Sequence, residues 1–263
     1  MDSILLIGCG NMGGAMLAGW LAGGLDPARF TVVDPLRTQT PAGVTLLREL
    51  PDGAFDAILL GVKPQLLGDV AGGVAKLARP GTLLLSILAG VELASLAARF
   101  PDAGGHVRIM PNLAAAIGKS PIALAAQGLD EPEKARVTGL MSPLGTPEWV
   151  DEELFDVVTA LAGSGPAFVY RFIDALAAGA SALGMPPSQA QRLALAMVEG
   201  AGTLASASPY RPGELARRVA SPGGTTEAGL KVLDADAALA RLAEATLRAA
   251  ADRSAQMAEA ARG

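Results

Sequence analysis

Apolar residues in the first 150 positions come in short, nearly uninterrupted runs, separated by longer segments in which apolar and polar residues mix. Short apolar runs without alternation are typical of strands that are covered on both faces of a sheet. The mixed segments have the length of helices that connect such strands. The predicted strands cover residues 4–7, 30–34, 56–62, 82–88, 106–110 and 120–125, with a further candidate at 147–150. The pattern therefore predicts an α/β fold with a mostly parallel, doubly wound sheet.

After about residue 151 the strand pattern stops, and long helical patterns rich in alanine and leucine replace it. The predicted helices cover residues 154–161, 167–183, 189–205 and 235–261. Gly163-Ser-Gly-Pro166 interrupts this helical region, so we expect a kink or a close contact between helices there. We therefore divide the chain into an α/β domain at residues 1–150 and an all-helical domain at residues 151–263.

The composition of 51% hydrophobic but only 4% aromatic residues indicates close backbone packing without large aromatic anchors. Helices this rich in small residues bury little surface by themselves, so we expect the helical domain to pair with a second copy of the chain. The net charge of −5, with no block of like charge, gives no footprint for nucleic acid. A single cysteine and a single histidine, Cys9 and His106, exclude an internal disulfide and leave no metal site predicted.

Residues 4–25 contain no charged side chain and are long enough to resemble a membrane span. The stretch nevertheless contains seven glycines and Asn11, and it follows Met-Asp-Ser without the basic region of a signal peptide. A buried strand followed by a tightly packed helix explains it better. We therefore expect no membrane contact and a cytoplasmic enzyme.

Glycines at three positions follow the first apolar run, within the segment Ile4-Leu-Leu-Ile-Gly-Cys-Gly-Asn-Met-Gly13. In a strand–turn–helix context, Gly8 permits the tight turn, Gly10 lets a pyrophosphate approach the backbone, and Gly13 lets the helix pack on the strand. The start of the helix presents unpaired N–H groups to an anion. The segment predicts a dinucleotide site, with an ordinary glycine-rich turn as the alternative.

Asp34 ends the second predicted strand, 21 residues after Gly13. An acid at this place can bind the ribose hydroxyls of NADH and would repel the 2′-phosphate of NADPH. A turn-forming aspartate before Pro35 is the alternative, and Arg37 lies near enough to meet a 2′-phosphate. Asp34 therefore favours NADH without excluding NADPH.

The segment Val219-Ala-Ser-Pro-Gly-Gly-Thr-Thr226 precedes another helical pattern, which runs from Glu227 onward. Backbone N–H groups of a glycine pair at a helix start can hold a small carboxylate, and threonine hydroxyls can complete the site. The alternative is a capped turn between helices, with Thr225 or Thr226 as the N-cap.

Other polar residues have structural interpretations. We expect His106, before a strand, to be structural, and Lys63, before Pro64, to be solvated unless it contacts a cofactor. Asp151, Glu152 and Glu153 have the pattern of an acidic first helical turn. No motif for a nucleophilic hydrolase is present.

Taken together, these segments resemble the pyrroline-5-carboxylate reductase family, whose members catalyse the last step of proline synthesis, over nearly the whole chain. The matching segments are Gly8-Cys-Gly-Asn-Met-Gly13, Val62-Lys-Pro-Gln65, Ala89-Gly90, Arg108-Ile-Met-Pro-Asn112, residues 158–167 and Ser221-Pro-Gly-Gly-Thr-Thr226. The resemblance implies a Rossmann domain, then a helical domain that forms an interleaved homodimer and often larger rings. It places the active site between the cofactor domain and helices of the neighbouring subunit.

The resemblance also implies residue roles. Together with Asp34, the cofactor-binding residues would be Gly8, Gly10, Asn11, Met12, Gly13, Val62, Lys63, Pro64, Ala89 and Asn112. The substrate-binding residues would be Ser221, Gly223, Gly224, Thr225 and Thr226. Thr226, which matches the family threonine near the ring nitrogen, would be the catalytic residue. The implied reaction is hydride transfer from NADH or NADPH to a cyclic imine.

The chain departs from the family pattern at two places. Leu113-Ala114 replaces the usual Thr-Pro after the Met-Pro-Asn segment, and Met197-Val198 replaces a common Gln-Thr pair. The alternatives are a related imine reductase, a 3-hydroxyacid dehydrogenase of the same architecture, and a nucleotide-binding regulator without catalysis. The dehydrogenase would carry a lysine where Arg171 stands, and Lys231 is the only lysine of the helical domain.

Overall fold

The computed structural model describes residues 1–262, which form two compact units. One unit consists of Met1–Ser164 with the C-terminal residues from Arg248 onward, and the other consists of Gly165–Leu247. Residues 151–164 thus group with the sheet, which places this division later in the chain than the boundary predicted at residue 150.

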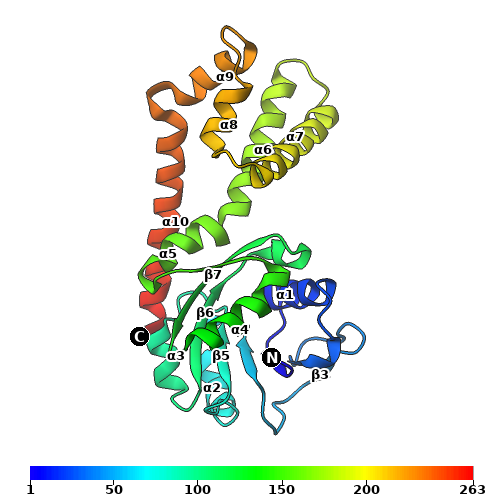
Figure 1. The fold of residues 1–263 in the computed structure, drawn as a ribbon, viewed down its shortest axis with the longest axis vertical. Helices are drawn as coiled ribbons and strands as arrows, with labels where there is room; N and C mark the ends of the chain where they lie inside the picture. Colours follow the sequence, from blue (N-terminus) through cyan, green and yellow to red (C-terminus); the bar gives the residue numbers. More distant parts are fainter. Residues whose placement is uncertain (263) are drawn as a thin grey trace. The chain divides into compact units, whose positions relative to one another are not determined.

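The first unit is built on an eight-stranded sheet with the order β3-β2-β1-β4-β5-β6-β7-β8 (Figure 1). The strands are β1 Ile4–Ile7, β2 Phe30–Val33, β3 Thr45–Leu47, β4 Ala57–Leu60, β5 Leu83–Ser86, β6 Gly105–Met110, β7 Ser120–Gln127 and β8 Gly145–Trp149. All neighbouring strands are parallel except β6 and β7. The predicted mostly parallel, doubly wound sheet is confirmed. The sequence pattern missed β3, a partly exposed strand of three residues.

Both faces of the sheet are buried, as the unbroken apolar runs predict. Within β1, Ile4 and Leu6 enter one hydrophobic cluster while Leu5 and Ile7 enter the other, because successive side chains point to opposite faces. The first cluster includes Trp20, whose ring stacks on Phe30 at 5.3 Å between centroids.

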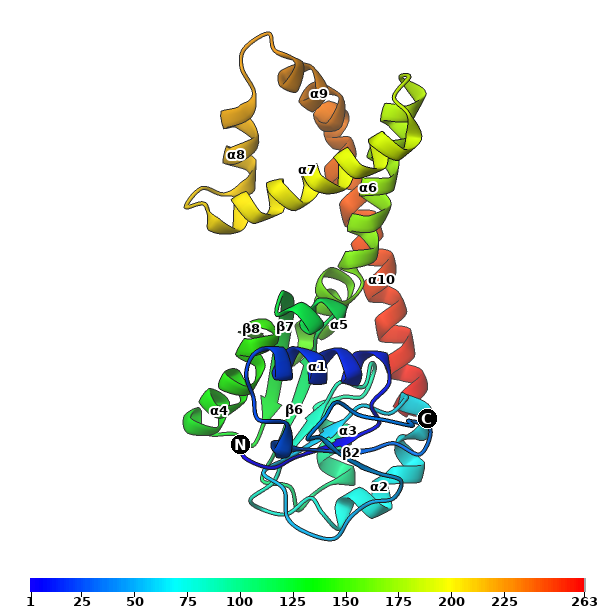
Figure 2. The same ribbon diagram turned by 90° about the vertical axis from the view of Figure 1, so that its right-hand side faces the viewer.

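Helices supply the other side of each cluster (Figures 1 and 2). Helices α1 (Asn11–Ala22) and α4 (Glu131–Met141) cover one face, and α2 (Leu67–Ala75) and α3 (Leu93–Arg99) cover the other. The remaining helical segments of the unit before residue 165 are η1 Pro27–Arg29, η2 Pro64–Leu66, η3 Leu113–Ile117, η4 Ser142–Leu144, η5 Glu152–Leu154, α5 Phe155–Val158 and η6 Thr159–Gly163.

The interruption expected near Gly163 is a π-helical turn, η6, which separates α5 from the next long helix. π-Helical turns are rare and often occur at functional sites.

The second unit contains only helices. They are α6 Gly165–Ala182, α7 Pro187–Ala207, α8 Pro212–Val219, α9 Thr225–Asp234, η7 Ala235–Ala237 and the first part of α10, Ala238–Arg262. Helices α6 and α7 pack together through a small cluster centred on Ala177, Ala190 and Ala194. Large apolar side chains of this unit remain exposed in the single chain, among them Val169, Tyr170, Phe172, Leu183, Leu193, Leu195, Met197, Leu204, Val219, Val232 and Leu242.

Over residues 1–262, no helix is long and apolar enough to cross a membrane, and no group of three or more His, Cys, Asp or Glu side chains is arranged to hold a metal ion.

Candidate functional site

The glycine loop after β1 meets the end of β4 at very close range. Gly8 has a φ of +84°, and a Cβ added there would lie 2.9 Å from the backbone nitrogen of Val62. A Cβ on Gly61 would lie 2.7 Å from the carbonyl oxygen of Gly8, and one on Gly13 would lie 3.1 Å from the same oxygen. Side chains at these positions would force the backbones apart. Gly61 was not among the predicted site residues, although its place directly after an apolar run was a signal for it.

Gly10 differs from these glycines, because a Cβ added there would meet no atom of the described chain within 4 Å. Packing within the protein therefore does not explain this glycine, whereas the approach of a ligand does. Gly10 is exposed and is the N-cap of α1, which has no side-chain cap. The first N–H groups of the helix, from Asn11 and Met12 on, are thus open to an anion. This cradle fits the pyrophosphate of a dinucleotide.

Asp34 lies beside the glycine loop, as its place after β2 predicts. Its Oδ2 accepts a hydrogen bond from the backbone N–H of Cys9 at 2.9 Å, and its Oδ1 accepts from Leu36 and Arg37 at 2.9 and 3.2 Å. Partial burial raises the pKa of Asp34, but the three backbone hydrogen bonds and the charge of Arg37 hold that pKa below its usual value. Asp34 is therefore charged at neutral pH and also forms the turn that was its alternative interpretation.

Arg37 contacts the same residue of the loop. Its Nη1 donates to the carbonyl oxygen of Cys9 at 2.5 Å and lies 3.3 Å from the Cys9 sulfur, while its Nε donates to Gln39 at 2.9 Å. Burial raises the pKa of the Cys9 thiol. A second guanidinium, that of Arg48, donates to the carbonyl oxygen of Pro35 at 2.7 Å. Two cations thus lie at the segment that follows β2.

The other predicted cofactor residues follow strands of the same sheet. Lys63 is exposed directly before η2, between Val62 and Pro64. Ala89 follows β5 and precedes Gly90, which has a φ of +76°. A Cβ added to Gly90 would lie 3.2 Å from backbone atoms of Ala258. The end of α10 therefore packs against this loop, which sequence analysis did not predict because the two segments are far apart along the chain.

Asn112, the last predicted cofactor residue, is 5% exposed and has its side chain bonded within the chain. Its Oδ1 accepts from the N–H of Ala114, and its Nδ2 donates to the carbonyl oxygen of Ala162, both at 2.9 Å. Asn112 thus connects the end of β6 to the π-helical turn, where Ala162 lies. A direct cofactor contact of Asn112 stays a prediction.

An ion pair that the sequence did not reveal stabilises the same region. Arg108 Nη1 lies 2.7 Å from Oε1 of Glu152, and the guanidinium lies 4.3 Å from the centre of the Phe155 ring. Glu152 also accepts the N–H of Leu93 at 2.8 Å. The acidic pattern at 151–153 indicated only a helix start. His106 is structural, as expected: it is 6% exposed and its Nε2 bonds with the carbonyl oxygen of Phe100 at 3.0 Å.

The second glycine-containing loop, residues 221–226, leads into α9. Gly224 is the N-cap of this helix and no side chain caps it, so the alternative that Thr225 or Thr226 is the N-cap is wrong. The cause is that the helix begins at Thr225, two residues before the predicted start at Glu227. Both threonine side chains are exposed.

The amides of this loop have acceptors within the chain. Gly223, at a φ of +71°, donates its N–H to Oε2 of Glu227 at 2.6 Å, and Gly224 donates to the carbonyl oxygen of Ser221 at 2.9 Å. Glu227 also pairs with Lys231 at 3.2 Å. A carboxylate oxygen therefore fits the hydrogen-bonding position at Gly223.

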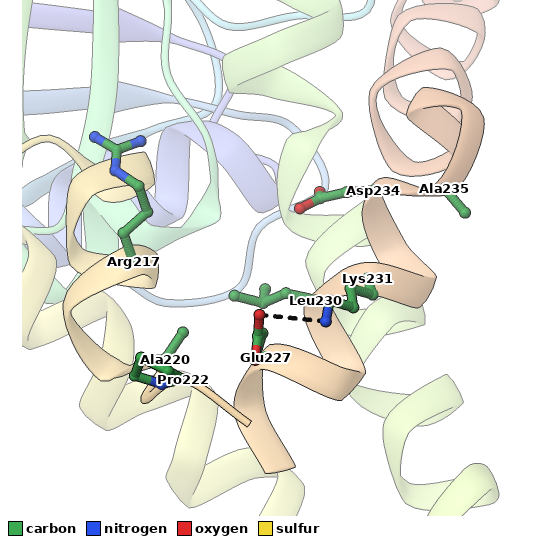
Figure 3. Close-up of a pocket in the computed structure, with 8 residues that line it drawn as sticks. All are labelled: Arg217, Ala220, Pro222, Glu227, Leu230, Lys231, Asp234 and Ala235. Atoms are coloured by element: carbon green, nitrogen blue, oxygen red, sulfur yellow. Dashed lines mark ion pairs between the residues drawn. The ribbon is translucent and has the colours of Figure 1, made fainter. Parts of the chain in front are cut away.

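A pocket of about 500 Å³ lies beside this loop. Figure 3 shows its lining side chains from the end of α8, the loop and α9: Arg217, Ala220, Pro222, Glu227, Leu230, Lys231, Asp234 and Ala235. Charged groups of both signs line it, and the Glu227–Lys231 ion pair lies on one side.

Comparison with known proteins gives consistent matches over both units. A family model described as pyrroline-5-carboxylate reductase dimerisation matches residues 152–257. The pyrroline-5-carboxylate reductase of Pseudomonas aeruginosa is 36% identical over 97% of this chain and 97% of that relative, and that of Aquifex aeolicus is 37% identical over 87% and 88%.

Solved structures agree in fold. A pyrroline-5-carboxylate reductase from Coxiella burnetii matches with a TM-score of 0.89 and 29% identity, over 97% of this chain and 98% of the other. The Plasmodium falciparum pyrroline carboxylate reductase with NADP bound matches with a TM-score of 0.81 over 98% of each chain. At 22% identity, this second match shows the fold alone.

Proposed function

Because this chain belongs to the pyrroline-5-carboxylate reductase family, we propose that it transfers hydride from NADH or NADPH to the cyclic imine pyrroline-5-carboxylate and so forms L-proline in proline biosynthesis. The observation that carries the proposal is the pair of glycine sites on one chain. One is the open cradle at Gly10, and the other is the Gly223–Gly224 loop beside its pocket.

The dinucleotide, when bound, supplies the hydride from its nicotinamide ring. The residues that would hold it are the glycine loop with Asn11 and Met12 at the pyrophosphate, Asp34 at the adenosine ribose, and the strand ends at Val62–Pro64 and Ala89. The Plasmodium falciparum relative binds NADP in its crystal structure. Taken alone, the negative charge of Asp34 favours NADH.

The loop at residues 221–226 would hold the carboxylate of the imino acid. Gly223 already donates its N–H to a carboxylate, that of Glu227, at 2.6 Å, so the amide geometry suits this group. Thr226 has an exposed side chain that is not used as a helix cap, and its hydroxyl can accept from the N–H of a protonated imine or donate to the carboxylate of a substrate. Ser221, Gly224 and Thr225 complete the loop.

The reaction requires little acid–base catalysis by the protein. An imine that is protonated at nitrogen before it binds is already a strong electrophile, so the chain mainly has to hold the ring flat at near-attack distance and exclude water. Positioning of this kind can account for a large part of a rate enhancement. It suits a site whose polar groups are backbone amides and a threonine.

The helical region supports a homodimer, because its cluster around Ala177 is small and its large apolar side chains are exposed. A larger ring built from such dimers is what the family resemblance implies. Exposed apolar surface of this extent favours association with a second copy. We also place the protein in the cytoplasm, on its composition and its single cysteine.

The test uses the full-length protein with synthetic pyrroline-5-carboxylate and either reduced dinucleotide. We expect the absorbance of the reduced nicotinamide to fall and proline to form in equal amount. An imine of larger ring size and a 3-hydroxyacid with the oxidised dinucleotide are assayed in parallel. Tight dinucleotide binding without turnover of any of these compounds would instead support a nucleotide-binding regulator.

A further inference from the structure

Two side chains of opposite charge hold the glycine loop from the segment after β2. Asp34 accepts the N–H of Cys9 at 2.9 Å, and Arg37 donates to the carbonyl oxygen of the same residue at 2.5 Å. We call this arrangement the Cys9 clamp. It binds both backbone polar groups of the residue between Gly8 and Gly10, so it sets the position of the loop that would receive the pyrophosphate.

The clamp leaves Asp34 little capacity for a ligand. An ionised carboxylate offers about four acceptor positions, and the N–H groups of Cys9, Leu36 and Arg37 take three of them. A ribose hydroxyl can use the remaining one. The main work of this carboxylate is therefore within the chain, and it serves either dinucleotide equally.

Arg37, in contrast, keeps donor capacity. Its Nε and Nη1 are bonded to Gln39 and Cys9, which fixes the plane of the guanidinium, while its Nη2 has no hydrogen-bond partner among residues 1–262. Arg48 lies at the same segment, bonded through Nη1 to the carbonyl oxygens of Asp34 and Pro35. One carboxylate and two guanidinium groups thus leave a net positive charge at this end of β2.

A guanidinium held in this way is suited to a phosphate. Arginine presents fixed, charge-assisted donors to phosphate oxygens. The repulsion between Asp34 and a 2′-phosphate is then offset by the two cations beside it. We propose that Arg37, assisted by Arg48, lets this chain accept the 2′-phosphate of NADPH, and that Asp34 is a positioning residue of the glycine loop for both dinucleotides.

The experiment measures binding, so that it does not depend on the proposed imine reduction; the inference rests only on the dinucleotide use included in the proposed function. Dissociation constants of the full-length protein are determined for NADPH and NADH by nicotinamide fluorescence, and for adenosine 2′,5′-bisphosphate and 5′-AMP by calorimetry. The variants are Arg37→Gln, Arg37→Lys, Arg48→Gln and Asp34→Asn. Arg136→Gln, an exposed arginine on α4 paired with Glu133, is the matched control for loss of one positive charge.

We expect Arg37→Gln to weaken the binding of NADPH and of the bisphosphate about ten- to hundredfold more than the binding of NADH and 5′-AMP, the usual effect of losing a hydrogen bond to a charged group. The smaller loss shared by all four ligands reflects the lost contact with Cys9, and Arg37→Lys should restore part of the selective loss because it retains the charge. Arg48→Gln should weaken NADPH and the bisphosphate by a smaller factor, again more than it weakens NADH and 5′-AMP. Asp34→Asn should weaken NADPH and NADH by similar factors.

Equal losses of NADPH and NADH in Arg37→Gln, or no loss of either, would overturn the assignment of Arg37. A loss confined to NADH in Asp34→Asn would overturn the positioning role of Asp34. If Arg37→Gln does not fold, Arg37→Lys decides, since a lysine keeps the charge but cannot make both contacts of Arg37, those with Cys9 and with Gln39. A protein that binds dinucleotides with these selectivities but reduces no imine would refute the proposed reaction and leave this inference intact.

Discussion

Replacing Thr226 by alanine tests the proposed substrate loop directly. The hydroxyl of Thr226 is exposed at the second position of α9, and Gly224 rather than a threonine is the N-cap. If the hydroxyl donates to the bound imino acid, its removal costs about 1.5–3 kcal/mol, which is roughly a ten- to hundredfold loss in kcat/KM. Dinucleotide affinity should change little.

The structure also determines what should happen to stability. Loss of an N-cap costs about 1 kcal/mol, but no side-chain cap exists at α9. Alanine has the higher helix propensity, by a few tenths of a kcal/mol up to about 0.7. The Thr226→Ala protein should therefore melt at the same temperature as the parent or slightly above it.

The assay combines steady-state kinetics, dinucleotide titration and thermal melts on Thr226→Ala, with Thr203→Ala, at an exposed threonine within α7, as the matched control. A selective loss of kcat/KM in Thr226→Ala, with unchanged melting, supports the ligand contact. Full activity with a lowered melting temperature would refute the reasoning, because the hydroxyl would then be a structural cap that the loop geometry does not show.

Three further predictions follow from other parts of the molecule. Both dinucleotides should be used, and Asp34→Ser should lower kcat/KM with NADH and with NADPH by similar factors, because the N–H of Cys9 loses its acceptor; a shift of the kcat/KM ratio toward one dinucleotide in this variant would contradict this. Light scattering should show a homo-oligomer, and a stable, active monomer at micromolar concentration would refute it. Glu152→Ala should lower the free energy of unfolding by about 2–3 kcal/mol, near the lower end for a buried pair. The value is modest because the side chain of Arg108 is 8% exposed but that of Glu152 is 31% exposed. Chemical denaturation measures this free energy, with the exposed Glu153→Ala as the control.

The sequence by itself determined the features that arise from local patterns. Each strand from β1 to β7 other than β3 was visible as an apolar run, because a strand buried on both faces must be apolar at successive positions. The glycine cradle at residues 8–13 was visible for a similar reason: glycine is required where the backbone turns or is approached closely, and that requirement is written in one short segment. The long helices after residue 165 also follow from local periodicity. The short β3 was not visible because it is partly exposed and so lacks a fully apolar run, and the η segments were not visible because a single turn carries too little periodic signal.

Only the tertiary structure decided which distant residues act together. The close approach of Gly61 to Gly8, the Arg108–Glu152 ion pair, the contact of Gly90 with α10 and the bond from Asn112 to the π-helical turn all join residues at least 44 positions apart. Such contacts depend on how strands and helices pack, and no local pattern encodes their partners. Asp34 illustrates the difference most clearly. Its position after β2 predicted a ribose contact. In the folded chain its carboxylate instead accepts the N–H of Cys9 in the glycine loop, and Arg37 lies beside it. This hydrogen bond stabilises the fold whether or not a ligand is bound, because a buried backbone N–H needs an acceptor.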